Sequence, residues 1–268
     1  MRSSAAGTER RPRPTPQRAI ARTASDPTSA RGVSTGQGSS PRGVRLPVYL
    51  RALLMTRTKL TDWVDWHDPY ADPQSPLSQR LAVVQRHIRG CLNGCRSCAS
   101  RVVSLCAGDG RDLLDVLGEQ QRLREARVRL VELDPDLVAS AETRAAAAEL
   151  SWVEVICADA ALTDVYAGAV PAELVLLCGV FGNISDADVQ RTIEALPQFC
   201  ADGATVVWTR HRRDPDLTAQ IRDWFTAADF HEIAFDSPGP NAWSVGRHSF
   251  HGDPQPLSPG VRLFTFIR

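Results

Sequence analysis

Residues 101–117 read RVVSLCAGDGRDLLDVL, and the rest of the fold is inferred outward from them. Val102, Val103 and Leu105 form a short apolar run, rich in β-branched residues, which is typical of a strand buried in a parallel sheet. A turn of small residues follows at 106–110, and after it apolar residues recur at helical spacing. A strand, a glycine turn and a helix form the first half of a nucleotide-binding βαβ unit. Glycine lets the backbone approach a ligand closely, and a helix N-terminus offers it free N–H groups.

Acidic residues stand at the ends of the next two predicted strands. Val128–Leu133 (VRLVEL) is a strand whose Glu132 lies 22 residues beyond Gly110, near the spacing of the ribose-binding acid in such units. Trp152–Ala160 (WVEVICADA) is a third strand, and it ends in Asp159. Because parallel sheets bind ligands at the carboxyl ends of their strands, both acids are predicted to face one crevice.

A fourth strand, Glu173–Gly179 (ELVLLCG), precedes Phe181, Gly182 and Asn183. In this order the elements resemble the class I S-adenosylmethionine-dependent methyltransferases, over residues 100–268. The alternation of strands and helices predicts an α/β fold with a doubly wound, mostly parallel sheet. The resemblance implies seven strands, an antiparallel C-terminal edge strand, and S-adenosylmethionine as the methyl donor.

The resemblance also assigns roles to residues. Glu132 would hold the ribose hydroxyls, Leu133 would adjoin the adenine, and Asp159 would accept a hydrogen bond from the adenine amino group. Residues 178–183 would form the wall beside the methyl group. The predicted donor site comprises Cys106, Ala107, Gly108, Asp109, Gly110, Arg111, Glu132, Leu133, Asp159, Ala160, Cys178 and Gly179.

One departure from the family pattern concerns the first strand. Ser104 and Cys106 stand where the family has an acid and the first glycine of Gly-x-Gly-x-Gly. The usual partner of the donor's ammonium group is therefore missing, and Arg111 is a candidate partner for its carboxylate. A nicotinamide dinucleotide fits less well, because Leu113 replaces the third glycine of the G-x-G-x-x-G motif and no second substrate domain is evident.

Charge is distributed unevenly along the 268 residues, although the formal net charge is zero. Residues 1–45 hold nine Arg against Glu9 and Asp26, so that they carry +7 and the rest carries −7. An acidic body argues against nucleic acid as a partner. We also expect no membrane partner and a cytoplasmic location, because no apolar run nears about 20 residues, no signal peptide is evident and the seven cysteines suit reduced thiols.

Three regions are expected along the chain. Residues 1–45, rich in Arg, Pro and Ser, are predicted to be a disordered tail, with an organellar transit peptide as the alternative. Residues 46–100 are predicted to form a helical cap, because apolar residues recur on one face after Ser75. Residues 101–268 would be the donor-binding domain. Its last three strands are predicted at 203–209, 230–236 and 260–268, and residues 237–259 are predicted to form a long loop between the last two.

Cys91, Cys95 and Cys98 have the spacing of the iron–sulfur motif of radical S-adenosylmethionine enzymes. With His87 one helical turn earlier, a zinc site is an alternative. The chain is too short and wrongly patterned for the barrel of the radical enzymes. We therefore expect a loop with reduced cysteines and no metal.

Aromatic residues and a histidine gather at 63–70, where they either pack the cap on the sheet or form a lid over the methyl site. The predicted catalytic residues are His67, as general base, Tyr70, in the lid, and Asn183, which would orient the acceptor or simply complete a turn. His211 and His248 are rival bases. The basic segment 209–213 is either a solvated loop or a grip for a carboxylate or phosphate.

The predicted function is methyl transfer from S-adenosylmethionine to a nitrogen, oxygen or sulfur atom of a small-molecule acceptor. Catalysis would come mostly from positioning and from excluding water. Two alternatives remain: a donor-binding sensor or partner subunit without transferase activity, and a metal protein that uses the cysteine triplet. The sequence does not indicate the oligomeric state.

Overall fold

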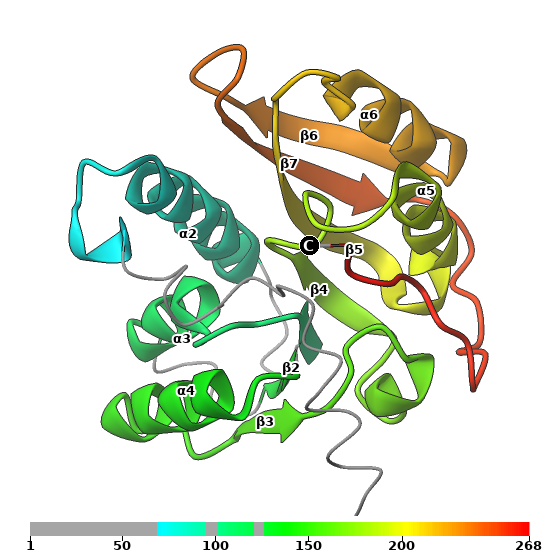
Figure 1. Ribbon diagram of the computed structural model, residues 1–268. Coiled ribbons are helices and arrows are strands. Elements are labelled where there is room, and N and C mark those ends of the chain that lie inside the picture. The colour runs from blue at the N-terminus through cyan, green and yellow to red at the C-terminus, as the bar shows by residue number, and fades with distance from the viewer. Residues whose placement is uncertain (1–68, 95–100, 121–125, 268) are drawn as a thin grey trace, which may run out of the picture. The chain divides into compact units, whose positions relative to one another are not determined.

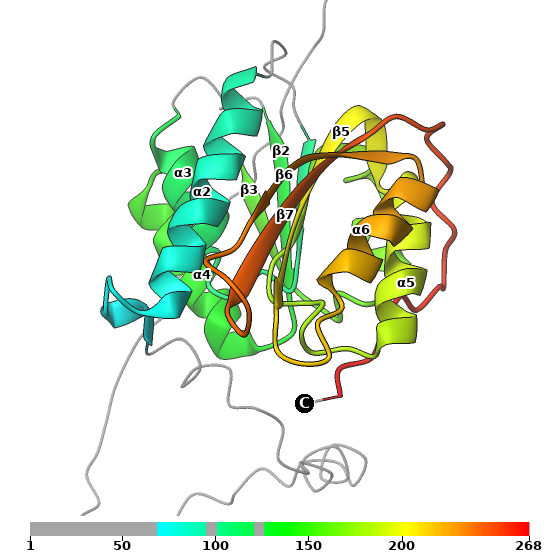
Figure 2. The same cartoon turned by 90° about the horizontal axis from the view of Figure 1, so that it is seen from above.

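The computed structural model describes residues 69–94, 101–120 and 126–267, which all belong to one unit, 56–268. A single seven-stranded sheet runs through this unit, with helices on both of its faces (Figures 1 and 2). The strands are β1 (Arg101–Leu105), β2 (Arg127–Glu132), β3 (Val153–Cys157), β4 (Ala172–Leu177), β5 (Cys200–His211), β6 (Phe230–Asp236) and β7 (Trp243–Phe250).

The strand order is β3-β2-β1-β4-β5-β7-β6. Neighbours pair in parallel from β3 to β5, whereas β7 runs antiparallel to both β5 and β6. The carboxyl ends of the first five strands therefore meet at one edge of the sheet. That edge is where ligands bind in folds of this kind.

Five α-helices of the described residues cover the sheet. α2, α3 and α4 lie on one face and α5 and α6 on the other (Figure 2). Their bounds are Pro76–Gly94 (α2), Arg111–Gly118 (α3), Pro135–Ala147 (α4), Asp186–Ala195 (α5) and Thr218–Ala227 (α6), with short 3₁₀ helices at Thr163–Tyr166 and Leu196–Gln198. The side chains of Asp134 and Ser185 accept backbone N–H groups at the starts of α4 and α5, as their sequence positions predicted.

Two apolar cores lie on the two faces of the sheet, because successive strand residues point to opposite sides. On β5, Val206 and Trp208 join the core under α5 and α6, and Val207 joins the core under α2, α3 and α4. Leu113 and Leu114 of α3 are fully buried in the second core. The packing of α3 fixes the turn that precedes it.

Helix α2 is the amphipathic helix predicted after Ser75. Val84, Ile88 and Leu92 are buried, and the helix packs on α3, β5 and β7. At its middle, His87 Nε2 lies 2.7 Å from an oxygen of Asp236 on β6. The other residues expected in the cap, 46–68 and 95–100, lie outside the described residues, so the division into cap and domain stays a prediction.

The seven-stranded, mostly parallel architecture confirms the predicted fold class, and β6 confirms the strand predicted at 230–236, but the strand predicted at 260–268 was wrong. The antiparallel strand is β7, inside the predicted loop 237–259, and it lies one place in from the edge, which β6 forms. Residues 260–267 make only two isolated bridges. The strand was missed because it is polar and contains Gly246, where a Cβ atom would lie 2.2 Å from the Trp208 ring.

The turn between β1 and α3 is built from residues in the left-handed region. Cys106, Gly108 and Gly110 have φ of 53°, 58° and 70°. A Cβ atom on Gly110 would meet Leu114 and Leu130 at 2.7 Å. Glycine is therefore required at 110, whereas Cys106 holds a conformation that costs an L-residue about 1–2 kcal/mol.

Substitutions at Cys106 test this geometry. In an ordinary strand or helix, a protein with glycine is less stable than one with alanine by about 0.5–1 kcal/mol. At position 106 we expect the reverse, because glycine adopts a positive φ without strain and alanine does not. In urea titrations, the free energy of unfolding of Cys106→Gly should therefore exceed that of Cys106→Ala by about 1 kcal/mol. Gly110→Ala, measured beside them, should be strongly destabilised. An alanine variant more stable than the glycine variant at 106 would contradict the described backbone.

Candidate functional site

Hydrogen bonds connect the ends of successive strands into one site. The Gly108 N–H donates to Glu132 Oε2 at 2.8 Å, which links the β1 turn to the end of β2. The Ala158 N–H donates to the carbonyl of Glu132 at 2.9 Å, which links β2 to the segment after β3. The Gly179 N–H donates to Thr209 Oγ1 at 2.8 Å, which links β4 to β5.

Glu132 is the centre of the predicted donor side of this site. Its Oε1 accepts the N–H groups of Leu133 at 2.8 Å and Asp134 at 3.0 Å, in addition to the bond from Gly108 to Oε2. The residue is only 9% exposed. Three backbone donors thus hold the carboxylate in place, and because an ionised carboxylate has about four lone-pair sites, Oε2 keeps capacity for a further donor.

The predicted adenine side combines an exposed apolar residue with a carboxylate. Leu133 is 63% exposed, which is unusual for a large apolar side chain of this protein. Asp159 accepts the Ala161 N–H at 3.0 Å and forms an ion pair with Arg262 at 2.9 Å. Ala160, by contrast, has its side chain in the core and its carbonyl bonded to the Tyr166 hydroxyl.

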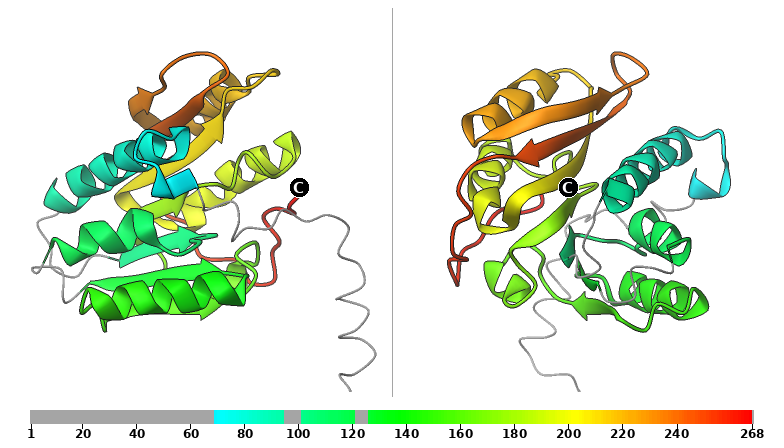
Figure 3. Two further views of the ribbon diagram at one scale, coloured as in Figure 1. Left: turned by 60° about the vertical axis from the view of Figure 1, so that its left-hand side comes forward. Right: turned by 180° about the vertical axis from the view of Figure 1, so that it is seen from behind.

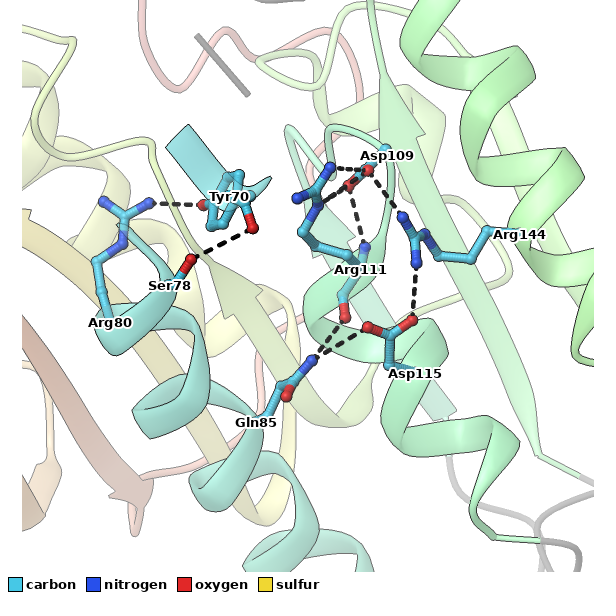
Figure 4. A network of polar contacts seen from close by, with 8 residues as sticks. All are labelled: Tyr70, Ser78, Arg80, Gln85, Asp109, Arg111, Asp115 and Arg144. Carbon is cyan, nitrogen blue, oxygen red and sulfur yellow. Dashed lines mark hydrogen bonds and ion pairs between the residues drawn. The ribbon is translucent and has the colours of Figure 1, made fainter. Parts of the chain in front are cut away.

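Asp109 forms a polar network that fixes the turn (Figure 4). Its carboxylate accepts hydrogen bonds from Arg111, at 2.9 Å from Nε, and from Arg144 of α4 at 3.2 Å. Burial alone raises the pKa of Asp109, but the hydrogen bonds and charges of the two arginines outweigh it, and the pKa lies below its usual range. Arg144 also binds Asp115 of α3, so one network joins the turn to two helices.

Arg111 is engaged on two sides. Asp109 binds its guanidinium, which also lies 4.3 Å from the centre of the Tyr70 ring. Its predicted role as partner of the donor's carboxylate stays a prediction. The Tyr70 hydroxyl accepts a hydrogen bond from Arg80 of α2 at 3.2 Å (Figure 4). Burial raises the pKa of Tyr70, so its hydroxyl is neutral near pH 7.

Asp112 was missed by the sequence analysis. It lies in the first turn of α3, is 9% exposed, and interacts with the Cys178 thiol at the end of β4. Its Oδ1 is buried and has no hydrogen-bond partner. Burial raises the pKa of Asp112 to about 6. Ser104 stands where the family that the chain resembles has an acid, and it is buried and uncharged. The missing acid is the signal in the sequence that could have directed attention to another acid nearby.

A cavity of about 500 Å³ adjoins this side of the site. It lies between the start of α2, the segment after β4, the end of β5 with the residues that follow it, and the loop that joins β6 to β7. Asn183 and Gly179 line it, and the Asn183 side chain donates to the Gly179 carbonyl at 2.6 Å. Polar lining residues also include Arg80, Thr209, Arg210, His211, Arg213 and Asn241.

The three histidines proposed as bases have different outcomes. His67 lies outside the described residues. His211 lines the cavity. His248 does not belong to the site: it is fully buried against Phe225, and burial lowers its pKa to about 4.

The cysteine triplet is described only in part. Cys91 is partly buried and its pKa is raised by burial, while Cys95 and Cys98 lie outside the described residues. Within the described ranges, no three His, Cys, Asp or Glu side chains gather as a metal site would require. In the same part of the chain, no helix has both the length and the apolar character needed to cross a membrane.

Comparison with known proteins finds similarity only at the level of structure. No family model and no curated protein matches this chain. Magnesium protoporphyrin IX methyltransferase from Synechocystis PCC 6803, crystallised with bound S-adenosylmethionine, superposes with a TM-score of 0.56 and 11% identity, over 79% of this chain and 100% of that one.

Two further structures are each similar over 66% of this chain. A possible exported protein from Bordetella parapertussis has a TM-score of 0.53 and 16% identity, over 66% of this chain and 68% of that one. An O-methyltransferase family protein from Burkholderia thailandensis has a TM-score of 0.50 and 17% identity, over 66% of this chain and 57% of its own length. At these identities the similarity concerns the fold, and the chain has the fold of the class I S-adenosylmethionine-dependent methyltransferases.

Proposed function

We propose that this protein transfers the methyl group of S-adenosylmethionine to a small-molecule acceptor. The observation that carries the proposal is the buried Glu132 carboxylate, which the β1 turn and the end of β2 hold at the carboxyl edge of the sheet. A carboxylate at that position suits the hydroxyls of a ribose. The exposed Leu133, after β2, and the Asp159 carboxylate, after β3, suit an adenine.

Asp112 gives the donor's amino acid part a partner. The donor carries an ammonium group, and the buried Oδ1 of Asp112 lacks the hydrogen bond that such an oxygen requires. We assign this carboxylate to the ammonium group, in place of the acid that Ser104 does not supply. Cys178 and Gly179 then lie beside the methyl group, at the boundary with the cavity.

The cavity is the acceptor side of the proposed site. The bound donor supplies a methyl group on a positively charged sulfur, which an acceptor atom attacks in line. Asn183, fixed by its bond to Gly179, borders the acceptor, and the neutral Tyr70 hydroxyl and Arg80 close the side toward α2. These residues position the acceptor and exclude water, which are the main sources of rate in such a transfer. The role of general base stays with His67 as a prediction.

A donor-binding protein without transferase activity is the second candidate. The first strand and its turn favour it, because Ser104 and Cys106 stand where the family it resembles has an acid and the first glycine of its donor-binding pattern. Formation of S-adenosylhomocysteine with an acceptor would decide for the transferase.

Replacing Glu132 tests the donor site. Glu132→Ala should weaken binding of S-adenosylmethionine by about ten- to a hundredfold, the effect of losing hydrogen bonds to a charged group. Calorimetry measures this at a temperature where circular dichroism shows the variant folded, since three backbone N–H groups also lose their acceptor. Glu154→Ala, which removes a β3 carboxylate bound to Arg129, is the control and should bind normally. Unchanged affinity in folded Glu132→Ala would contradict the assignment.

Replacing Asp112 should separate stability from binding. The pKa of Asp112 rises from 3.8 to about 6 on folding, so the ionised carboxylate lowers the free energy of unfolding by about 3 kcal/mol at pH 8. Stability present below pH 4 is therefore lost as the pH rises through 6. Asp112→Asn should be more stable than the wild type at pH 8 and should bind S-adenosylmethionine at least tenfold more weakly.

The pH dependence and a control complete this test. Wild-type affinity for the donor should fall below about pH 6, as Asp112 becomes protonated, and the affinity of Asp112→Asn should not. Asp115→Asn removes a 40% exposed carboxylate one turn along α3 and serves as the control for charge. A variant at 112 that is less stable at pH 8 and binds the donor normally would rule out the proposed role.

A further inference from the structure

The cavity concentrates positive charge. Arg80, Arg210, His211 and Arg213 line it, and its described lining holds no Asp or Glu; Asp186, outside the lining, pairs with Arg210. This contrasts with the rest of the chain after residue 45, which carries seven more acidic than basic residues. A hollow lined by one sign of charge focuses the field and attracts ligands of the opposite sign.

The four basic residues do not have equal roles. Arg210 is 8% exposed and bonds to the Phe181 carbonyl and, at 3.3 Å, to Asp186, so it fixes the wall of the cavity. Arg80 donates to the neutral Tyr70 hydroxyl, and its positive charge acts on the Cys178 thiol at the end of β4. Arg213 is exposed, and its backbone N–H donates to His211 Nδ1 at 3.3 Å.

His211 lies in the cavity lining together with Gly182. Its Nδ1 accepts the backbone N–H of Arg213 at 3.3 Å, so the ring is held by the segment that carries Arg213. A Cβ atom on Gly182 would approach the Cδ2 carbon of the ring at 3.3 Å, so the ring packs closely on this glycine. The imidazole thus adds a third basic side chain to those of Arg80 and Arg213.

The remainder of the lining is apolar. Pro76 and Leu77 at the start of α2 and Pro238 and Trp243 at the loop between β6 and β7 contribute to it. A cavity of about 500 Å³ with apolar walls and a few convergent polar groups is typical of a site for a small organic ligand.

We propose that the acceptor is a small organic anion, with a carboxylate or phosphate group held by Arg80, His211 and Arg213 and an apolar body against Leu77 and Trp243. Guanidinium groups form charge-assisted, often bidentate hydrogen bonds with both anions. A cationic amine would be repelled. That this anion is the methyl acceptor rests on the proposed function, whereas the preference of the cavity for anions rests on its lining alone.

Calorimetry with four matched probes tests the proposal: 4-hydroxybenzoate, phenyl phosphate, the neutral 4-hydroxybenzamide and the cationic tyramine, each added to the full-length protein. At least one anion should bind ten times more tightly than the amide and tyramine. Arg213→Gln and Arg80→Gln should each weaken the anion by about ten- to a hundredfold. The first two probes decide between carboxylate and phosphate.

Arg212→Gln is the matched control, because Arg212 lies in the same segment but bonds to Asp216 at 2.8 Å and is not part of the cavity lining. It should bind the anion as the wild type does. Three results would each overturn the proposal. They are anions that bind no more tightly than 4-hydroxybenzamide, tyramine that binds more tightly than the anions, and a loss of anion affinity in Arg212→Gln as large as in Arg213→Gln.

Donor affinity, measured in the same samples, distinguishes the two proposals. Binding of S-adenosylmethionine without anion binding would refute the anionic acceptor and leave the proposed function in place. Anion binding that depends on Arg213, without donor binding, would refute the proposed function and support the chemistry assigned to the cavity.

Discussion

A single buried carboxylate joins the first two strand ends of this protein. Glu132 accepts one N–H from the turn after β1 and two from the start of the next loop. Each bond to an ionised acceptor is stronger than a neutral one, and burial makes their loss costly. β1 and β2 are paired neighbours in the sheet, and the bond from Gly108 to Glu132 fixes the distance between the glycine turn and the end of β2. The two strand ends therefore form one rigid edge of the crevice.

Two aspartates of the same segment illustrate opposite uses of a buried charge. Asp109 is satisfied by two arginines and holds the turn to α3 and α4. Asp112, three residues later, keeps an oxygen without a partner. A buried polar group without a hydrogen bond destabilises the folded state, so each such group calls for an explanation, and a functional role is one of them. The contrast separates the part of the turn that supports the fold from the part that suits binding.

The sequence was sufficient for the parallel half of the sheet. The strands around Val102, Leu130 and Val175 are short apolar runs buried on both faces, and the caps at Asp134 and Ser185 are local signals. β7 was missed because its partner on the sheet, Trp208, demands a glycine where strand patterns demand a side chain. Position 246 must be glycine because of Trp208, which lies 38 residues earlier in the chain. A pattern of neighbouring residues contains no information about such a distant partner.

The site was predicted less completely for a related reason. Glu132 and Asp159 follow from strand ends, but the cavity takes its residues from α2, β5 and the loop before β7, which meet only in the folded protein. Asp112 required knowledge of which face of α3 meets β4.

The segment after β7 returns across the carboxyl edge of the sheet (Figure 3). Leu263 donates to the Ala161 carbonyl at 2.8 Å and Ile267 to the Asn183 carbonyl at 2.9 Å, while Arg262 holds Asp159. The last described residues thus border the segments that follow both β3 and β4. For laboratory work this has a practical meaning: an affinity tag or fluorescent fusion appended to the carboxyl end would emerge beside this edge of the sheet and could obstruct a ligand there.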